Sequence, residues 1–213
     1  MNNFCILLTT CINVKNSKND FIFNKNGKIT SISEERIKLY EKVIKFYLEN
    51  TDFEIYCVES SGNFFNIEHE RFNFISCDIN NINSSSQGEI KSILYAYEYF
   101  KKEWKRKNMK YIVKITGKYI LTELSHWVDK KEVKTCNYDI WTQDIYNENQ
   151  NNTEIFICKI CLLKKILKKY NNELFEEFMY KTINSNKYIC AKLPKFKNVL
   201  KSVRADGNIL EYL

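Results

Sequence analysis

The sequence is poor in the residues that interrupt a fold: its 213 residues include one proline and five glycines. Linkers between domains are usually rich in proline, glycine or serine, and the sequence has no such tract, no internal repeat and no low-complexity segment. A chain of this length can bury one sizeable core, since chains usually divide only beyond roughly 250 residues. We therefore expect a single domain over residues 1–213.

Long apolar runs are also missing. No stretch approaches the ~20 consecutive apolar residues of a membrane-spanning helix. The first apolar run, Phe4 to Ile12, lacks the charged leader and the small-residue cleavage site of a secretory signal. These absences predict a cytoplasmic protein without a transmembrane segment.

Several motifs that would identify a chemistry are absent. Neither the dinucleotide fingerprint G-x-G-x-x-G nor the phosphate-binding loop G-x-x-x-x-G-K-[ST] occurs, which argues against a dehydrogenase and a P-loop NTPase. The two histidines, His69 and His126, lie far apart and give little support to a histidine nucleophile or metal cluster. Of the eight cysteines only Cys158 and Cys161 form a C-x-x-C pair, so buried thiols are a better interpretation than zinc.

Positive charge is in excess, with 33 lysines and arginines against 26 acidic residues and a net charge of +7. This excess favours an anionic partner such as a phosphate-bearing small molecule, a nucleic acid or a membrane surface. Much of it lies in the runs 101–107 and 164–169, which are typical of solvated helix faces and lack interleaved aromatic residues. We expect no DNA partner, and nucleic-acid binding remains an alternative.

The order of predicted elements is strand, helix, strand, strand, helix, strand, and the strands are short continuous apolar runs. That pattern is typical of a buried, largely parallel sheet, and it predicts an open α/β fold with helices flanking the sheet. A β-hairpin is expected within residues 20–30. The expected strands are 4–12, 53–58, 72–77, 111–115, 138–142 and 154–161, and the expected helices are 33–50, 86–104 and 171–183.

Ligands of open α/β sheets bind outside the carboxyl ends of the strands, so the residues that follow each strand are candidates. They are Thr9, Thr10 and Cys11, then Glu59 to Gly62, Asp78 to Asn80, and Lys114 to Tyr119. Lys114 interrupts an apolar strand, where an ammonium is costly to bury without an anion. A neighbouring carboxylate would serve as well as a ligand. Glu89 has the spacing of a capping box with Ser86, which favours a structural role.

Four segments resemble the GT-A class of glycosyltransferases. They are Leu8-Thr9-Thr10, the turn Val58 to Gly62, the helix start Ser85 to Ser92, and Tyr111 to Leu121. The last is similar to the K-I-T-G-[KR]-Y segment of small bacterial and large-DNA-virus glycosyltransferases, including viral enzymes that build capsid glycans. The resemblance implies a nucleotide-binding half at 1–121 and an acceptor-side half at 122–213, with the host cytoplasm as the location if the protein is viral.

The resemblance implies transfer of a hexose from a nucleoside diphosphate sugar, UDP-linked by preference, to a sugar hydroxyl of a glycan or glycoprotein. Thr9, Thr10, Glu59 and Ser60 would hold the nucleoside, with Cys11 beside them. Gly88 and Lys91 would face the donor from a helix. Lys114, Lys118 and Arg204 are the cations that could neutralise the diphosphate.

The sequence departs from the family at the metal site. Many GT-A enzymes have Asp-x-Asp after the fourth strand, where carboxylates hold a divalent cation against the diphosphate. This chain has Lys114-Ile115-Thr116 there. Either lysine and arginine replace the cation, or a manganese or magnesium ion uses another acid such as Asp78. We expect the cation, with Asp78 as its ligand.

An inverting reaction would also need a general base, and the later acidic residues are its candidates. We predict Asp78, Glu176 and Asp206 as catalytic residues; Asp139, Asp144 and Glu177 are further candidates. One rival function is a sugar nucleotidyltransferase, which normally has a glycine-rich loop soon after the first strand, whereas residues 11–20 contain no glycine. The other rival is a module that binds nucleic acid or glycan without turnover.

Overall fold

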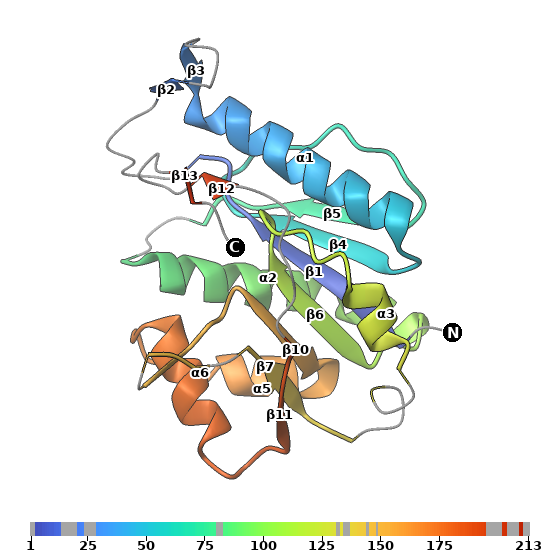
Figure 1. Ribbon diagram of the computed structural model, residues 1–213, viewed down its shortest axis with the longest axis vertical. Coiled ribbons are helices and arrows are strands. Elements are labelled where there is room, and N and C mark those ends of the chain that lie inside the picture. The colour runs from blue at the N-terminus through green and yellow to red at the C-terminus, as the bar shows by residue number, and fades with distance from the viewer. Residues whose placement is uncertain are drawn as a thin grey trace.

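The protein is organised around one open sheet of seven strands, in the order β11-β7-β10-β6-β1-β4-β5 (Figure 1). The computed structural model describes residues 3–13, 21–23, 29–79, 83–130, 133, 137–143, 145–147, 149–194, 202–203 and 209–210. The strands are β1 (Phe4–Thr10), β4 (Glu54–Glu59), β5 (Phe72–Ser76), β6 (Tyr111–Thr116), β7 (Ile140–Thr142), β10 (Ile155–Lys159) and β11 (Cys190–Lys192).

Most neighbouring strands of this sheet are parallel. β5, β4, β1 and β6 all run in one direction, and β11 runs parallel to β7. β10 is antiparallel to both of its neighbours, β6 and β7. The predicted open, mostly parallel α/β sheet is therefore confirmed, with one reversed strand inside it.

Helices cover both faces of the sheet. α1 (Ile32–Asn50) lies over one face, and α2 (Ser85–Arg106), α5 (Ile160–Leu167) and α6 (Phe175–Ile183) lie over the other (Figure 1). A short helix, α3 (Leu124–Val128), follows β6 on the α1 side. No helix in the described part of the chain combines the length and the apolar character needed to cross a membrane.

β1 explains why the central strands are continuous apolar runs. All seven of its residues are buried, and they alternate between the two cores. Phe4, Ile6 and Leu8 pack on the α1 side, whereas Cys5 and Leu7 pack on the α2 side. Because both faces are covered by helices, neither set of positions can be polar until the strand ends.

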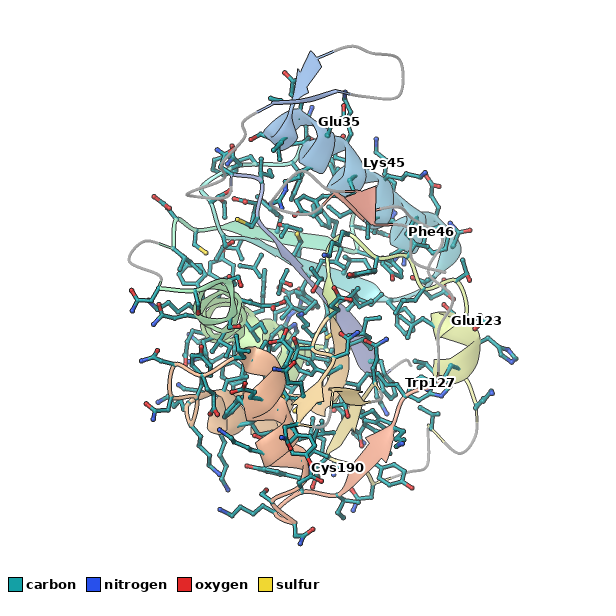
Figure 2. The ribbon with its side chains drawn as sticks, turned by 60° about the vertical axis from the view of Figure 1, so that its left-hand side comes forward. Glu35, Lys45, Phe46, Glu123, Trp127 and Cys190 are labelled. Carbon is teal, nitrogen blue, oxygen red and sulfur yellow. The ribbon has the colours of Figure 1, made fainter. Side chains whose placement is uncertain are left out.

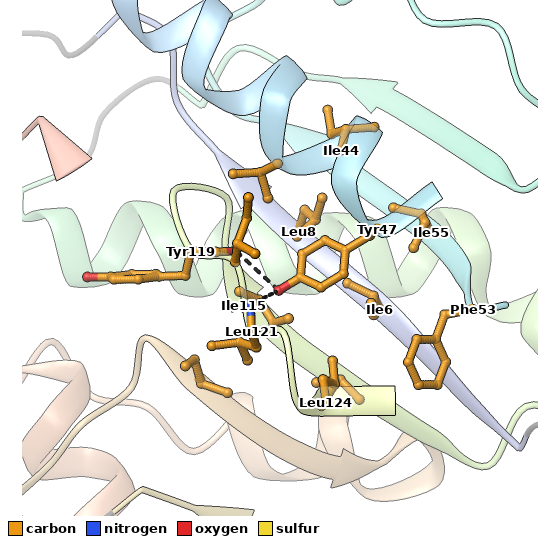
Figure 3. Packing of buried hydrophobic residues seen from close by; sticks show 14 of the residues in the cluster. Ile6, Leu8, Ile44, Tyr47, Phe53, Ile55, Ile115, Tyr119, Leu121 and Leu124 are labelled. Atoms are coloured by element: carbon orange, nitrogen blue, oxygen red, sulfur yellow. Dashed lines mark hydrogen bonds between the residues drawn. The ribbon is translucent and has the colours of Figure 1, made fainter. Parts of the chain in front are cut away.

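Tyr47 fixes the segment that follows β6 against α1 (Figure 3). Its ring is completely buried among apolar side chains, and its hydroxyl donates to the carbonyl of Tyr119 at 3.1 Å and accepts from the Leu121 amide at 3.0 Å. A buried hydroxyl is costly unless its hydrogen bonds are made. The two bonds thereby set the path of the chain immediately after the carboxyl end of β6.

α2 begins earlier than its predicted capping box. Ser84 is the N-cap, and its Oγ accepts from the Gln87 amide at 3.1 Å. Gln87 Oε1 in turn accepts from the Asn83 amide at 2.8 Å. The pairing of Ser86 with Glu89 as a capping box was therefore wrong, and Glu89 is free of any capping role.

The boundary between the later strand and the helix that follows it also differs from the sequence prediction. The expected strand 154–161 ends at Lys159, and α5 starts at Ile160, so Cys158 is in a strand and Cys161 in a helix. The expected hairpin is present as β2 (Phe21–Phe23) paired antiparallel with β3 (Ile29–Ser31). Two more small ribbons pair β8 (Ile145–Asn147) with β9 (Gln150–Asn151) and β12 (Ser202–Val203) with β13 (Ile209–Leu210).

Candidate active site

The carboxyl ends of β1, β4 and β6 form a continuous edge, which we call the strand rim: residues 9–11, 59–61 and 116–118. The strand register places Thr10 beside Glu59 and Thr9 beside Thr116. Past the strands, the Ser60 amide donates to the Thr10 carbonyl at 3.0 Å, and the Gly117 amide donates to the Thr9 carbonyl at 2.9 Å. Three of the four strand ends predicted to hold the ligand are thus brought together.

Glu59 organises the β4 side of the strand rim. Its carboxylate is completely buried. One oxygen accepts from the Ile12 amide at 2.9 Å and the Ser61 hydroxyl at 2.5 Å, and the other accepts from the amides of Ser61 at 3.0 Å and Asn63 at 2.7 Å. Both oxygens are therefore occupied by the loops after β1 and β4. Glu59 shapes the site and has no oxygen left for the nucleoside contact predicted for it.

Gly117 is where β1 and β6 close against each other. A Cβ atom at this position would lie 2.5 Å from Thr10 Cγ2 and 3.2 Å from the Thr9 carbonyl oxygen. Both threonines are buried, and Thr10 Oγ1 donates to the Val58 carbonyl at 3.1 Å. Any side chain at residue 117 would push these strand ends apart, so glycine is required here by the close approach.

Lys114 forms a buried ion pair with Glu89. The lysine side chain is completely inaccessible, and its Nζ contacts Glu89 Oε1 while donating to Thr116 Oγ1 at 3.0 Å and to the Thr153 carbonyl at 2.8 Å. The neighbouring-carboxylate alternative for Lys114 is thus the arrangement in this structure. The ammonium has no remaining access to the diphosphate contact predicted for it.

Glu89 itself lies at the strand rim. The same Oε1 accepts from Thr9 Oγ1 and from Thr116 Oγ1, each at 3.3 Å, and a quarter of the side chain stays exposed. Sequence reasoning missed this residue because a capping box explained it. The signal that could have found it is Lys114, whose burial demands a carboxylate from another element.

Lys118 is the rim lysine with solvent access. Its side chain is 19% exposed, and its Nζ lies 3.6 Å from Glu154 Oε1, which Tyr119 also contacts through its hydroxyl. Burial lowers the pKa of the Lys118 ammonium, and the positive charge of Arg36 acts in the same direction, whereas the carboxylates of Glu154 and Glu89 oppose the shift. Lys118 therefore lies within the electrostatic influence of one cation, Arg36, and two carboxylates, Glu154 and Glu89.

Arg36, on α1, is a second cation at the rim. It is only 8% exposed, and its Nη1 donates to the Cys11 carbonyl at 2.6 Å, an oxygen that also accepts from the Tyr40 hydroxyl at 3.2 Å. Its Nε is buried without an acceptor, and no ion pair of Arg36 occurs among the described residues. Sequence reasoning missed Arg36, although it lies one helical turn before the buried Tyr40 and so on the inward face of α1.

The other predicted residues of the β1–β4 side are Ser60 and Cys11, which belong to the rim, and Asp78, which lies beside it. Ser60 Oγ donates to the Thr10 carbonyl at 3.0 Å. Cys11 is partly buried, and burial raises the pKa of its thiol. Asp78, predicted as catalytic and as a metal ligand, is exposed and forms an isolated antiparallel bridge with Ser61. It therefore borders the turn after β4, beside Gly62, whose Cβ would lie 3.7 Å from that of Asp78.

The predicted residues on the helices lie at different distances along the chain from the rim, on α2 and on α6. Gly88 and Lys91 lie in the first two turns of α2, beside Glu89. Glu176 lies in the first turn of α6, where its Oε1 accepts from Thr153 Oγ1 at 3.2 Å. Because the Thr153 carbonyl binds Lys114, Glu176 is linked to the β6 side of the rim.

Two further predicted residues, Asp139 and Glu177, have partners outside the rim. Asp139 pairs with Lys159 at 2.8 Å, at the amino end of β6 and so away from the rim. Glu177 Oε1 accepts from Gln150 Nε2 at 3.5 Å. The remaining predicted residues, Asn80, Asp144, Arg204 and Asp206, lie outside the described residues.

A cation at a nucleotide site is held by one or two carboxylates together with the substrate phosphates, so the predicted manganese or magnesium ion, with Asp78 as its ligand, stays a prediction. No group of three or more His, Cys, Asp or Glu side chains within them is arranged to hold a metal. The two carboxylates nearest the β6 end, Glu89 and Glu154, are each already paired with a lysine. The strand position that carries Asp-x-Asp in GT-A enzymes here supplies a lysine that neutralises a carboxylate.

A hollow lies elsewhere on the surface, along α1. It has a volume of about 430 Å³ and runs along the outward face of α1, where Lys45 and Phe46 are labelled in Figure 2. Lysines and glutamates alternate in its lining, so their charges largely cancel, and the hollow lacks the buried charges of the strand rim. The lining residues are Lys38, Glu41, Lys42, Lys45, Phe46, Glu49 and Ile120.

An open α/β sheet with polar, charged strand ends is the architecture in which nucleotides bind at the carboxyl edge. The chain has the fold of nucleotide-sugar transferases. It is similar to a protein of Desulfovibrio desulfuricans G20 assigned as a nucleotide-diphospho-sugar transferase, with a TM-score of 0.53 and 9% identity over 91% of this chain and 80% of that one. It is also similar to a cytidylyltransferase from Leptospira borgpetersenii, with a TM-score of 0.51 and 16% identity over 92% and 77% of the two chains.

A third solved structure is a glycosyltransferase involved in glycosylation of the major capsid of PBCV-1, with a TM-score of 0.46 and 8% identity over 89% of this chain and 81% of that one. The sequence matches no protein-family model and no curated protein. At these identities the first two structures establish the fold alone.

Proposed function

We propose that this chain is a glycosyltransferase that moves a hexose from a nucleoside diphosphate sugar, UDP-linked by preference, to a hydroxyl of a glycan or glycoprotein. The observation that carries the proposal is the strand rim, where Arg36 and Lys118 lie at the ends of β1 and β6 in a nucleotide-sugar transferase fold. A cytoplasmic location, in the host if the protein is viral, belongs to the same proposal.

The reaction breaks the bond between the anomeric carbon and the β-phosphate oxygen, and the electron pair leaves with the diphosphate. A bond forms from the acceptor oxygen to the anomeric carbon, and the acceptor proton passes to a carboxylate. Fixed positive charge at the departing phosphate lowers the barrier because it is already in place when the negative charge develops. In the proposal Arg36 and Lys118 supply that charge, and no step depends on a divalent cation.

The remaining roles follow from the geometry of the rim. Thr9, Thr10, Cys11 and Ser60 form the floor on which the nucleoside would lie, and Glu59 holds that floor in shape. We retain Glu176 as the proposed general base, because α6 brings it to Thr153 on the later half of the chain. Asp78, Arg204 and Asp206 stay predictions.

Nucleotidyl transfer is the second candidate, favoured by the similarity to a cytidylyltransferase. In that reaction a sugar phosphate attacks the α-phosphate of a nucleoside triphosphate, and pyrophosphate leaves. The glycine-rich loop that usually grips the triphosphate has no counterpart in residues 11–20. Glycosyl transfer needs no such loop, and it is therefore the preferred proposal.

One assay separates the two reactions. The protein is incubated with UDP- and GDP-sugars, and in parallel with CTP or UTP plus a hexose 1-phosphate, while release of nucleoside diphosphate and of pyrophosphate is measured. We expect slow hydrolysis of a nucleotide sugar to give the diphosphate, and no pyrophosphate. Release of pyrophosphate without nucleoside diphosphate would establish the second candidate. If the protein neither binds nor turns over either class of substrate, both proposals are overturned.

A further inference from the structure

Glu89 is a carboxylate held through one oxygen only. Its Oε1 receives the Lys114 ammonium and the hydroxyls of Thr9 and Thr116. Its Oε2 makes no hydrogen bond with any described residue, and the side chain is 25% exposed. One oxygen is therefore fixed by the ends of β1 and β6, and the other has no partner among the described residues.

The neighbouring carboxylates differ from this arrangement. Glu59 is fully buried and uses both oxygens to bind backbone and hydroxyl donors. Glu154 is paired with Lys118, an ammonium 3.6 Å away that is itself 19% exposed. Of these three carboxylates, Glu89 alone contacts a completely buried ammonium. The position of its second oxygen, Oε2, is therefore the most narrowly fixed.

Stability does not explain why β6 carries that ammonium. Lys114 is surrounded by strands whose neighbouring positions are apolar, and its Nζ lies 5.9 Å from the centre of the Phe156 ring. Replacing a buried ion pair by apolar residues of similar size is often neutral or stabilising, because desolvation offsets the attraction between the charges. The pair is accordingly better explained by what it holds in place.

We infer that Glu89 binds a hydroxyl of the nucleotide sugar through Oε2, and that Lys114 is the positioning residue that aims it. This inference rests on the proposed function, since it names the ligand group recognised at the same rim. A carboxylate oxygen accepts hydrogen bonds from hydroxyl groups, and Oε2 is the oxygen of Glu89 that no described residue occupies. Because Oε1 is already occupied by the Lys114 ammonium and two hydroxyls, the structure assigns Glu89 to substrate recognition and leaves proton removal to another group.

The test compares ligands that differ by one hydroxyl. Binding of UDP-hexose, its 2′-deoxyuridine analogue and its deoxyhexose analogues is measured by calorimetry for the wild-type protein and for Glu89→Gln. A hydrogen bond to a charged group is worth enough to change affinity by roughly tenfold to a hundredfold. We expect wild type to discriminate against one deoxy analogue by that factor, and Glu89→Gln to lose most of the discrimination while binding that analogue as wild type does.

Two variants guard against a trivial loss of folding. Glu98→Gln, on the same helix but in the exposed ion pairs with Lys101 and Lys164, should behave as wild type. The double variant Glu89→Leu with Lys114→Met removes both charges together and should fold, yet fail to discriminate between the hydroxyl and deoxy ligands.

The outcomes separate the inference from the function beneath it. If nucleotide sugars bind and Glu89→Gln keeps full discrimination, the inference is overturned and the transferase proposal stands. Equal weakening of every ligand by Glu89→Gln, with or without a hydroxyl, would also overturn it. If wild type binds no nucleotide sugar at all, the proposed function and the inference fall together.

Discussion

The two sides of the strand rim bury one charge each and satisfy it in different ways. On the β4 side, Glu59 is surrounded by neutral donors from its own loops, and none of its oxygens reaches the surface. On the β6 side, Lys114 is neutralised by Glu89, a carboxylate that keeps a quarter of its surface exposed. The Glu59 arrangement holds the loops after β1 and β4 together, whereas the Lys114–Glu89 pair leaves a carboxylate partly exposed at the rim. We therefore expect mutations on the β4 side to change stability and mutations on the β6 side to change ligand binding.

The largest effect is expected at Glu59. Glu59→Ala leaves the amides of Ile12, Ser61 and Asn63 without an acceptor, and each unsatisfied buried group costs about 1–3 kcal/mol. We expect the free energy of unfolding to fall by about 3 kcal/mol or more, measured by urea denaturation. Glu68→Ala, an exposed glutamate on the next loop, is the control, and an equal change in both variants would contradict the assignment of Glu59 as the centre of the β4 side.

Glu176 tests whether the later half of the chain supplies the base. Glu176→Gln keeps the bond to Thr153 but cannot take a proton, so we expect kcat to fall by about 100-fold with little change in donor affinity. Its neighbour Glu177 contacts Gln150 instead, and Glu177→Gln is the matched control. Similar rates for the two variants would remove Glu176 from the mechanism.

Gly117 joins the two sides. Gly117→Ala places a methyl group against Thr10 Cγ2, and overpacking of this kind costs about 1–3 kcal/mol. Thr10→Ser deletes that Cγ2 atom, so the double variant should regain part of the lost unfolding free energy in the same urea experiment. Additive losses in the double variant would show that the clash is not the cause.

Lys118 should give the smallest effect and the one most sensitive to pH. Lys118→Ala should weaken UDP or pyrophosphate binding by about tenfold in the presence of EDTA, whereas Lys110→Ala, at the opposite end of β6, should not. A requirement for manganese or magnesium in wild-type binding would contradict the proposal that cations of the protein neutralise the diphosphate.

The pH dependence follows from the lowered pKa of Lys118. A lowered folded-state pKa means that the ammonium loses its proton at a lower pH than an ordinary lysine. The affinity that it supplies is thus present at low pH and lost as the pH rises through that lowered pKa. Lys118→Arg keeps its charge throughout this range, so it should bind without that pH dependence.

The sequence was sufficient to predict the sheet because its central strands are buried on both faces and contain little but apolar residues. The ends of the strands could also be predicted, since polar residues follow each apolar run where the helices no longer cover the sheet. The first residue of α2 could not be predicted, because Ser84, Ser85 and Ser86 follow one another and each can cap a helix. The choice among them decided whether Glu89 was a cap or a rim residue.

The partners of charged residues were the least predictable part of the site. Lys114 and Glu89 lie on different elements, and only the packing of α2 over β6 brings them together. Arg36 was hidden for a related reason, because the apolar pattern of α1 is complete without it. A charge on the inward side of a helix or strand is therefore a better guide to this site than any motif in the sequence.

The antiparallel strand β10 brings the segment that precedes it to the candidate site. Because β10 runs against β6, its beginning reaches the strand rim, and Thr153 and Glu154 arrive there from the β8–β9 ribbon. Insertions or deletions in that ribbon would reshape one wall of the site without shifting the register of any strand. Under the proposed function, acceptor selectivity would therefore change with the length of this ribbon, while Arg36 and Lys118 keep their places at the ends of β1 and β6.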